Sequence, residues 1–192
     1  ALTPDLKGAP VWADKIIDQY VTRSDIAGAF SLWAHTQPDD STIGQVGIRN
    51  ENFDGKSNPP FGWKLYTGPA GTAKISNDGL QITHSGASGA IFVRQLLTLP
   101  PGRHSLSFDT GNGAEKATNL VWRIDCLESG QTILELPLAS LYSFEDQGAD
   151  SFVVPPQGCP GQWVALAGRA LEIPETRSLE IKRVSIDREP TR

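Results

Sequence analysis

Apolar residues near the start of the chain recur at the three- and four-residue steps of an amphipathic helix. Trp12, Ile16, Ile17 and Tyr20 form a stripe of the kind that one buried helix face requires. Pro10 suits the first turn of such a helix, because its missing N–H would have no partner there. The pattern predicts a first helix that begins near Pro10.

A second helical pattern follows Ser24, a suitable N-cap residue, and ends at Gln37-Pro38. A lone pair of amphipathic helices does not bury its apolar faces completely, so the pair must pack on the domain that follows or on further helices outside this chain. We expect it to pack on the domain that follows. We predict a helical hairpin extension over residues 1–48. The apolar stripe of its second helix comprises Ile26, Ala27, Phe30, Trp33 and Ala34.

From Asn50 onward, short alternating runs are separated by clusters of Gly, Pro, Asn and Asp, a pattern typical of two packed sheets. We therefore predict a β-sandwich over residues 49–192. The expected strands are Gly79 to His84, Ala90 to Leu99, His104 to Thr110, Leu120 to Leu127, Thr132 to Leu138, Ser151 to Val154, Trp163 to Ala167, and Leu179 to Asp187.

The alternation within these strands assigns side chains to faces. Trp122 is in step with the apolar residues of its strand and is predicted to lie in the core, which leaves Arg123 and Asp125 outside. The same parity places Asp109 outside. With Arg94, these residues would form a hydrogen-bonding surface for hydroxyls or carboxylates if their strands are neighbours. The alternative, ordinary solvated charges, stays open.

Exposed aromatic rings are candidates for sugar binding because they stack on the apolar face of a pyranose. Trp63 follows a Pro-rich loop, where it would either cap the sandwich or present its ring to a ligand, and Tyr66 is a second candidate contact. Trp163 begins a strand and is expected at a sheet end. Trp12 and Trp33 belong to the helix stripes and are expected to pack.

Composition excludes several classes of protein. Of the 192 residues, 20% are charged and 39% are apolar, which is ordinary for a folded, turn-rich chain. The net charge of -5 leaves no broad cationic surface for nucleic acid or an anionic membrane. No apolar stretch approaches the roughly 18 to 20 residues of a transmembrane helix.

The two cysteines, Cys126 and Cys159, are first interpreted as a disulfide that closes a loop of roughly 33 residues. Two buried free thiols remain the alternative, and a metal site lacks partner ligands at usable spacing. A disulfide needs an oxidising compartment, so we expect a secreted or periplasmic protein. The chain has no Met, even at position 1, and we expect that Ala1 arose by signal removal or trimming.

Signatures of catalysis are missing from the sequence. His35, His84 and His104 show no zinc spacing, and no nucleophile turn, phosphate-binding loop or dinucleotide fingerprint occurs. A glycosidase would need two convergent carboxyl groups, and nothing local distinguishes such a pair among 22 acids. We expect no enzyme, although a glycan-active one stays open.

The segment NENFDGKSNPPFGWKL, from Asn50 to Leu65, resembles the opening of galactose-binding-like jelly rolls. The Gly79-Leu80 strand, the LTLPPGRHSLSFD hairpin and the closing strand LEIKRVSID follow in the same order as in that family. The resemblance implies a mainly β fold, a jelly-roll β-sandwich, and often a carbohydrate ligand. It also implies a structural calcium where the first and last strands meet, at Asp54 and Asp187, although no dense D-x-D loop supports this.

The segment DIAGAFSLWAHTQPDD resembles the second helix and exit of a tetratricopeptide unit. Together with the W-x-I-x-C motif at Trp122 to Cys126 and Gly158-Cys159-Pro160, it resembles bacterial extracytoplasmic proteins associated with exopolysaccharide export. This implies a non-catalytic carbohydrate-binding module with a polysaccharide or envelope protein as partner. The alternative is a protein-interaction scaffold, which exposed apolar helix surface would favour.

Overall fold

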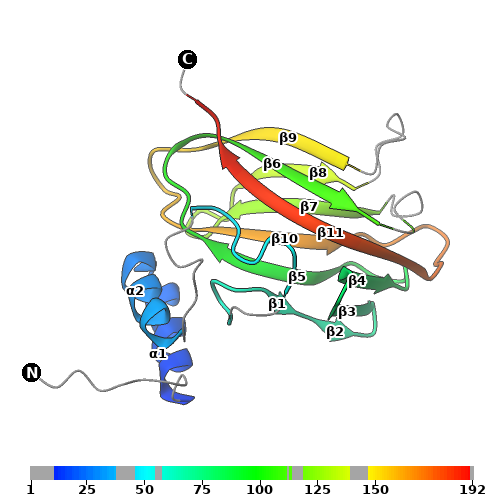
Figure 1. Cartoon of the computed structure of the whole chain (residues 1–192), viewed down its shortest axis with the longest axis horizontal. Coiled ribbons are helices and arrows are strands. Elements are labelled where there is room, and N and C mark those ends of the chain that lie inside the picture. The colour runs from blue at the N-terminus through cyan, green and yellow to red at the C-terminus, as the bar shows by residue number, and fades with distance from the viewer. Residues whose placement is uncertain are drawn as a thin grey trace, which may run out of the picture.

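A computed structural model of the chain describes residues 11–37, 46–54, 58–111, 113, 119–138 and 147–190. Two antiparallel sheets lie face to face, and two helices lie side by side at one end of this sandwich (Figure 1). The predicted fold class, a mainly β jelly-roll sandwich with a short N-terminal helical hairpin, is confirmed. Neither described helix is long and apolar enough to cross a membrane.

The first sheet has five strands in the order β1-β5-β10-β7-β8, and the second has six in the order β2-β3-β4-β11-β6-β9. Helix α1 spans Val11–Thr22 and α2 spans Ile26–Thr36. The strands are β1 Lys64–Leu65, β2 Thr67–Gly68, β3 Gly71–Ser76, β4 Gly79–His84, β5 Ala90–Leu97, β6 Gly102–Thr110, β7 Leu120–Cys126, β8 Thr132–Pro137, β9 Gln147–Val154, β10 Gln162–Gly168 and β11 Arg177–Arg188.

All eight strands expected from the sequence are present, with ends that differ by a few residues at most. Three further strands, β1, β2 and β3, were not predicted. Only Ala73 of β3 is fully buried, so the strand carries almost no apolar alternation. It forms because every residue from Gly71 to Ser76 pairs with β4.

The sandwich core follows the predicted alternation. Trp122 is completely buried, together with the other inward residues of β7, while Arg123 and Asp125 reach the surface. Leu106 and Phe108 of β6 are buried in the same core. Period-two patterning therefore assigned the central strands to the correct faces.

A second, smaller core joins the helices to the outer face of the five-stranded sheet. Its largest side chain is that of Trp33, which is 1% exposed and whose indole N–H donates to the Asn58 carbonyl at 2.8 Å. The expectation that the hairpin packs on the sandwich is confirmed. The fully buried residues of this core are Ile17, Ile26, Ala29, Trp33, Phe61 and Leu96.

Arg49 links the two cores. Its guanidinium carbon lies 4.7 Å from the centre of the Phe30 ring and 5.5 Å from that of Trp33. The buried Gln95 amide accepts from the Arg49 backbone N–H and donates to the Arg49 carbonyl, both at 2.9 Å. The segment that enters the sandwich is thus fixed to β5 and to the hairpin at one residue.

Two details of the helices were predicted wrongly. Trp12, Ile16 and Tyr20 were expected in the buried face of α1, but they are 48%, 36% and 36% exposed. The apolar residues of α1 cover two adjacent rows, and only the row with Ile17 faces the protein. The N-cap of α2 is Asp25 rather than Ser24, because the Asp25 carboxylate accepts from the Gly28 N–H at 2.9 Å.

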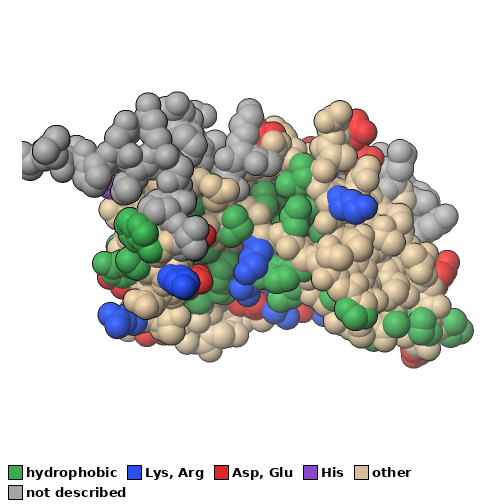
Figure 2. Space-filling view, turned by 90° about the horizontal axis from the view of Figure 1, so that it is seen from below, with side chains coloured by type: hydrophobic (Ala, Val, Ile, Leu, Met, Phe, Trp, Pro, Cys, Tyr) green, Lys and Arg blue, Asp and Glu red, His purple; other side chains and the backbone are tan. Residues whose placement is uncertain are grey.

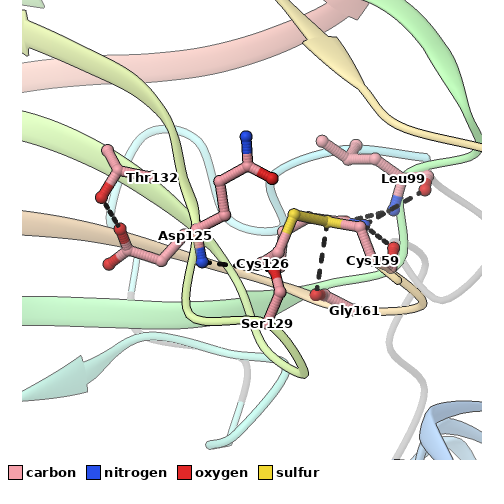
Figure 3. The surroundings of a disulfide bond; sticks show 9 residues. Leu99, Asp125, Cys126, Ser129, Thr132, Cys159 and Gly161 are labelled. Carbon is pink, nitrogen blue, oxygen red and sulfur yellow. Dashed lines mark hydrogen bonds between the residues drawn. A yellow bond between two sulfur atoms is a disulfide. The ribbon is translucent and has the colours of Figure 1, made fainter. Parts of the chain in front are cut away.

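The predicted disulfide between Cys126 and Cys159 is confirmed, with the two Cα atoms 4.9 Å apart. It ties the end of β7 to the loop that precedes β10 (Figure 3). Gln162, the first residue of β10, supports the same loop by donating to the Cys159 carbonyl at 2.7 Å. The start of β10 is therefore held both covalently and by hydrogen bonds.

Candidate functional site

A cleft of about 660 Å³ lies between the helical hairpin and the outer face of the five-stranded sheet. Figure 2 shows the molecule from below the view of Figure 1. Basic and hydrophobic side chains lie next to each other in the middle of this face, between the end that carries the helices and the β-sandwich. The described residues that line the cleft are Asp14, Asp18, Val21, Thr22, Trp33, Thr36, Gln37, Asn58, Pro59, Pro60, Lys64, Arg94 and Trp163.

The strand register brings the basic side chains of this sheet into one row. Lys64 of β1 pairs with Arg94 of β5, Arg94 pairs with Ala165 of β10, and Ala165 pairs with Arg123 of β7. Cross-strand neighbours share a face, and strands are about 4.8 Å apart, so Arg94 and Arg123 lie about 10 Å from each other. The residue between the two arginines, Ala165, has only a methyl side chain and so does not separate them with a bulky group.

Arg94 contacts the ring faces of two aromatic side chains. Its guanidinium carbon lies 4.4 Å from the centre of the Trp163 ring and 5.5 Å from that of Tyr66. Lys64 approaches the same Tyr66 ring, with Nζ at 5.6 Å. Such cation–π contacts hold the long Arg94 side chain against the sheet, at the border of the cleft.

The cleft has cations on one wall and carboxylates on the other. Among the described residues, no carboxylate lies within salt-bridge distance of Arg94 or Lys64, and no cation lies within that distance of Asp14 or Asp18. Asp14 and Asp18 are one turn apart on α1. A ligand in the cleft would meet acceptors from the helix and donors from the sheet.

Tyr66 offers a direct test of its contact with Arg94. Burial raises the pKa of the Tyr66 phenol above 10.0, and the Arg94 guanidinium partly lowers it. The raised pKa means that Tyr66 contributes stability below pH 10 that is lost as the pH rises through its folded pKa. We expect Arg94→Gln to raise the pKa further. The measurement is the tyrosinate absorbance of each protein minus that of its Tyr66→Phe counterpart, and a lower pKa in the variant would contradict the contact.

The structure brings some of the predicted ligand-binding residues together. Arg94 lines the cleft, and the Tyr66 ring contacts the Arg94 guanidinium. Arg123 and Asp125 share the same sheet face as Arg94. Arg123 donates to the Asp125 carboxylate at 2.7 Å, so these two residues satisfy each other outside the cleft. Asp109 belongs to β6 in the opposite sheet, and the predicted surface of four charged residues does not form.

Trp63 is corrected from a ligand-binding candidate to a core residue. It is 5% exposed, and its ring packs 5.3 Å from Phe53 and 6.0 Å from Trp122, centre to centre. Its indole N–H donates to the Asn50 carbonyl at 3.0 Å. With both its ring and its polar atom engaged, Trp63 caps the sandwich.

Several lining residues were not predicted as site residues. Nothing in the sequence distinguishes Asp14 and Asp18 from other acidic residues of a helix, and Lys64 lies in a strand of only two residues. Trp163 was expected at a sheet end, which is correct, but its alternation with the buried Val164 gave a signal that its ring faces outward.

Asp54 and Asp187, the predicted calcium ligands, are both exposed. The Asp54 backbone N–H donates to the Asn50 side chain at 2.7 Å, and Asp187 is in register with Ser105 on β6. In the part of the chain that the structure describes, no group of three or more His, Cys, Asp or Glu residues is placed to hold a metal. The calcium site stays a prediction.

No family model matches the chain, and none of the curated proteins matches it. Solved structures that are similar include TmCBM61 in complex with β-1,4-galactotriose, at 12% identity over 74% of this chain and 94% of that one, with a TM-score of 0.38. A CBM4 structure is 14% identical over 74% and 99% of the two chains, with a TM-score of 0.46. The Stig cyclase Fisc from Fischerella sp. TAU is 13% identical over 77% and 99%, with a TM-score of 0.39.

Proposed function

We propose that the chain is a non-catalytic carbohydrate-binding module whose ligand occupies the cleft between the hairpin and the five-stranded sheet. The observation that carries this proposal is the composition of the cleft, where Trp163 and the stacked Arg94 face Asp14 and Asp18 across a volume of about 660 Å³. Binding sites of this size combine apolar lining with a few placed polar groups.

The chemistry of the lining suits a sugar. A pyranose has hydroxyl groups around its edge and an apolar face of C–H groups. Carboxylates such as Asp14 and Asp18 accept from hydroxyls, and Lys64 and Arg94 donate to them. Val21, Pro60 and Trp163 offer apolar contact. The cleft therefore provides acceptors, donors and apolar surface within reach of one small ligand.

A catalytic role is not part of the proposal. The acids among the described lining residues, Asp14 and Asp18, lie one turn apart on a single helix and so belong to one wall. Glycoside hydrolysis needs two carboxyl groups that flank the scissile bond. Recognition without turnover is the function that this arrangement supports.

The proposal includes a secreted or periplasmic location. The Cys126–Cys159 disulfide supports it, since such bonds persist in oxidising compartments. The resemblance of the segment DIAGAFSLWAHTQPDD to a tetratricopeptide unit motivates one further part of the proposal. In this part, the hairpin is a tetratricopeptide-like unit of an exopolysaccharide-associated envelope protein.

Binding to an array of bacterial and plant polysaccharides tests this function. We expect saturable binding that weakens about tenfold or more in Trp163→Ala, because the variant removes apolar lining and the support of Arg94. Trp12→Ala is the matched control, since Trp12 is an exposed tryptophan outside the cleft lining, and it should bind like the parent. Full binding by a folded Trp163→Ala protein would place the ligand elsewhere.

The second candidate function is protein interaction, favoured by the exposed row of Trp12, Ile16 and Tyr20 on α1. These residues are spaced at four-residue steps and form a continuous apolar face. Such a face suits another amphipathic helix of an envelope assembly. Absence of binding to every polysaccharide of the array would favour protein interaction through this helix face over carbohydrate binding in the cleft.

A further inference from the structure

The hydrogen-bonding state of Arg94 distinguishes it from the other arginines on the same sheet face. Its Nε is buried and has no hydrogen-bond partner in the described part of the chain. Arg123 is paired with Asp125, and Arg169 is paired with Glu135. A buried N–H of a cation that lacks a partner is costly and uncommon in folded proteins. Among these three arginines, Arg94 is therefore the one that has hydrogen-bond donors left for a ligand.

The surroundings of Arg94 define what would satisfy it. Trp163 and Tyr66 contact the guanidinium carbon at 4.4 and 5.5 Å, and a ring face supplies no lone pair in the plane of the N–H groups. Lys64, its register partner on β1, adds a second positive charge beside it. Two adjacent cations, one with a planar fork of donors, match the two oxygens of a carboxylate.

The opposite wall limits how many acidic groups the ligand carries. Asp14 and Asp18 line the cleft from α1, and the whole chain has a net charge of -5. A densely charged polyanion would be repelled by both. A single carboxylate directed at the sheet, with hydroxyl groups directed at α1, satisfies both walls at once.

We infer that the cleft binds a saccharide in which an acidic sugar is flanked by neutral ones, with the carboxylate held by Arg94 and Lys64. This inference rests on the proposed carbohydrate function and specifies its ligand class. Arg94 is the specificity-determining residue, while Trp163 and Tyr66 position its guanidinium.

The test compares glucuronoxylan and xanthan with their carboxyl-reduced derivatives, which keep the sugar chain and lose the charge. We expect the parent protein to bind at least one native polymer about tenfold or more tightly than its reduced form, with a preference that shrinks at high salt. Arg94→Gln should abolish the preference. Arg123→Gln, which removes the same charge from the same sheet face outside the cleft, should retain it.

Each outcome separates the inference from the proposed function. Equal binding to native and reduced polymers by the parent protein would overturn the inference and leave carbohydrate binding intact. Loss of preference in Arg123→Gln as well as in Arg94→Gln would show a diffuse charge effect and would also overturn it. Absence of binding to every neutral and acidic polysaccharide of the array would defeat the proposed function itself. If Arg94→Gln does not fold, Lys64→Gln replaces it, because Lys64 is exposed.

Discussion

Replacement of Trp33 by alanine is expected to lower the free energy of unfolding by about 3 to 5 kcal/mol, the usual cost of removing a fully buried aromatic ring. Trp33 is 1% exposed and packs against Phe61 with a ring-centre distance of 5.4 Å. The variant also leaves the Asn58 carbonyl without its indole donor and removes a ring from beside Arg49. These losses fall at one point, the joint between the hairpin and the sandwich.

Chemical denaturation of both proteins, with tryptophan fluorescence and circular dichroism as probes, measures this effect. Trp12→Ala is the control, because Trp12 is a helix tryptophan that is about half exposed, and its replacement should change stability by no more than about 0.5 kcal/mol. We also expect Trp33→Ala to lose ligand binding, since Trp33 lines the cleft. A loss in Trp33→Ala as small as that expected for Trp12→Ala would show that the hairpin does not depend on the Trp33 contact.

Local patterning predicted the elements of this fold well. The alternation along β7 identified Trp122 as core and Arg123 as outward, because period-two burial depends only on neighbours in the same strand. The run of β4 was predicted with its observed bounds, Gly79–His84. The short or weakly apolar strands β1, β2 and β3 are stabilised mainly by pairing with β5, β3 and β4 respectively, and their own residues carry little signal.

The candidate site could not be predicted because it depends on contacts between distant segments. Arg94 and Arg123 share a row because β10, late in the chain, inserts between β5 and β7. The irregular register at Leu166 and Ala167 of β10 shifts the pairing with β5 by one residue. Parity alone places each side chain on a face, but it does not choose the neighbouring strand.

The charged surface predicted around Asp109 failed for the same reason. Asp109 has the expected outward parity on β6, but β6 belongs to the six-stranded sheet, so its outward face is the opposite side of the sandwich. The predicted burial of Trp12 failed because two adjacent rows of α1 are apolar and only the packing partner selects between them. In each case the local period was correct and the long-range partner was unknown.

Removal of the disulfide in the double variant Cys126→Ala, Cys159→Ala is expected to lower the free energy of unfolding by about 3 to 4 kcal/mol. The bond closes a loop of 33 residues, and its loss restores conformational entropy to the unfolded chain. This is a large share of the roughly 5 to 15 kcal/mol that stabilises an ordinary domain.

The folded structure of this variant should nevertheless keep its cleft. Gln162 donates to the Cys159 carbonyl and accepts from the Leu99 N–H at 2.8 Å, and it pairs with Cys126 across β7 and β10. These bonds hold the start of β10, and with it Trp163, in the folded state without the covalent link. Denaturation under oxidising and reducing conditions measures the prediction: the parent should lose stability on reduction, whereas the double variant should not respond. Equal stability of the oxidised parent and the double variant would mean that the unfolded chain is restrained by something other than the disulfide. A less stable variant with unchanged ligand affinity would show that the disulfide acts in folding and not in recognition.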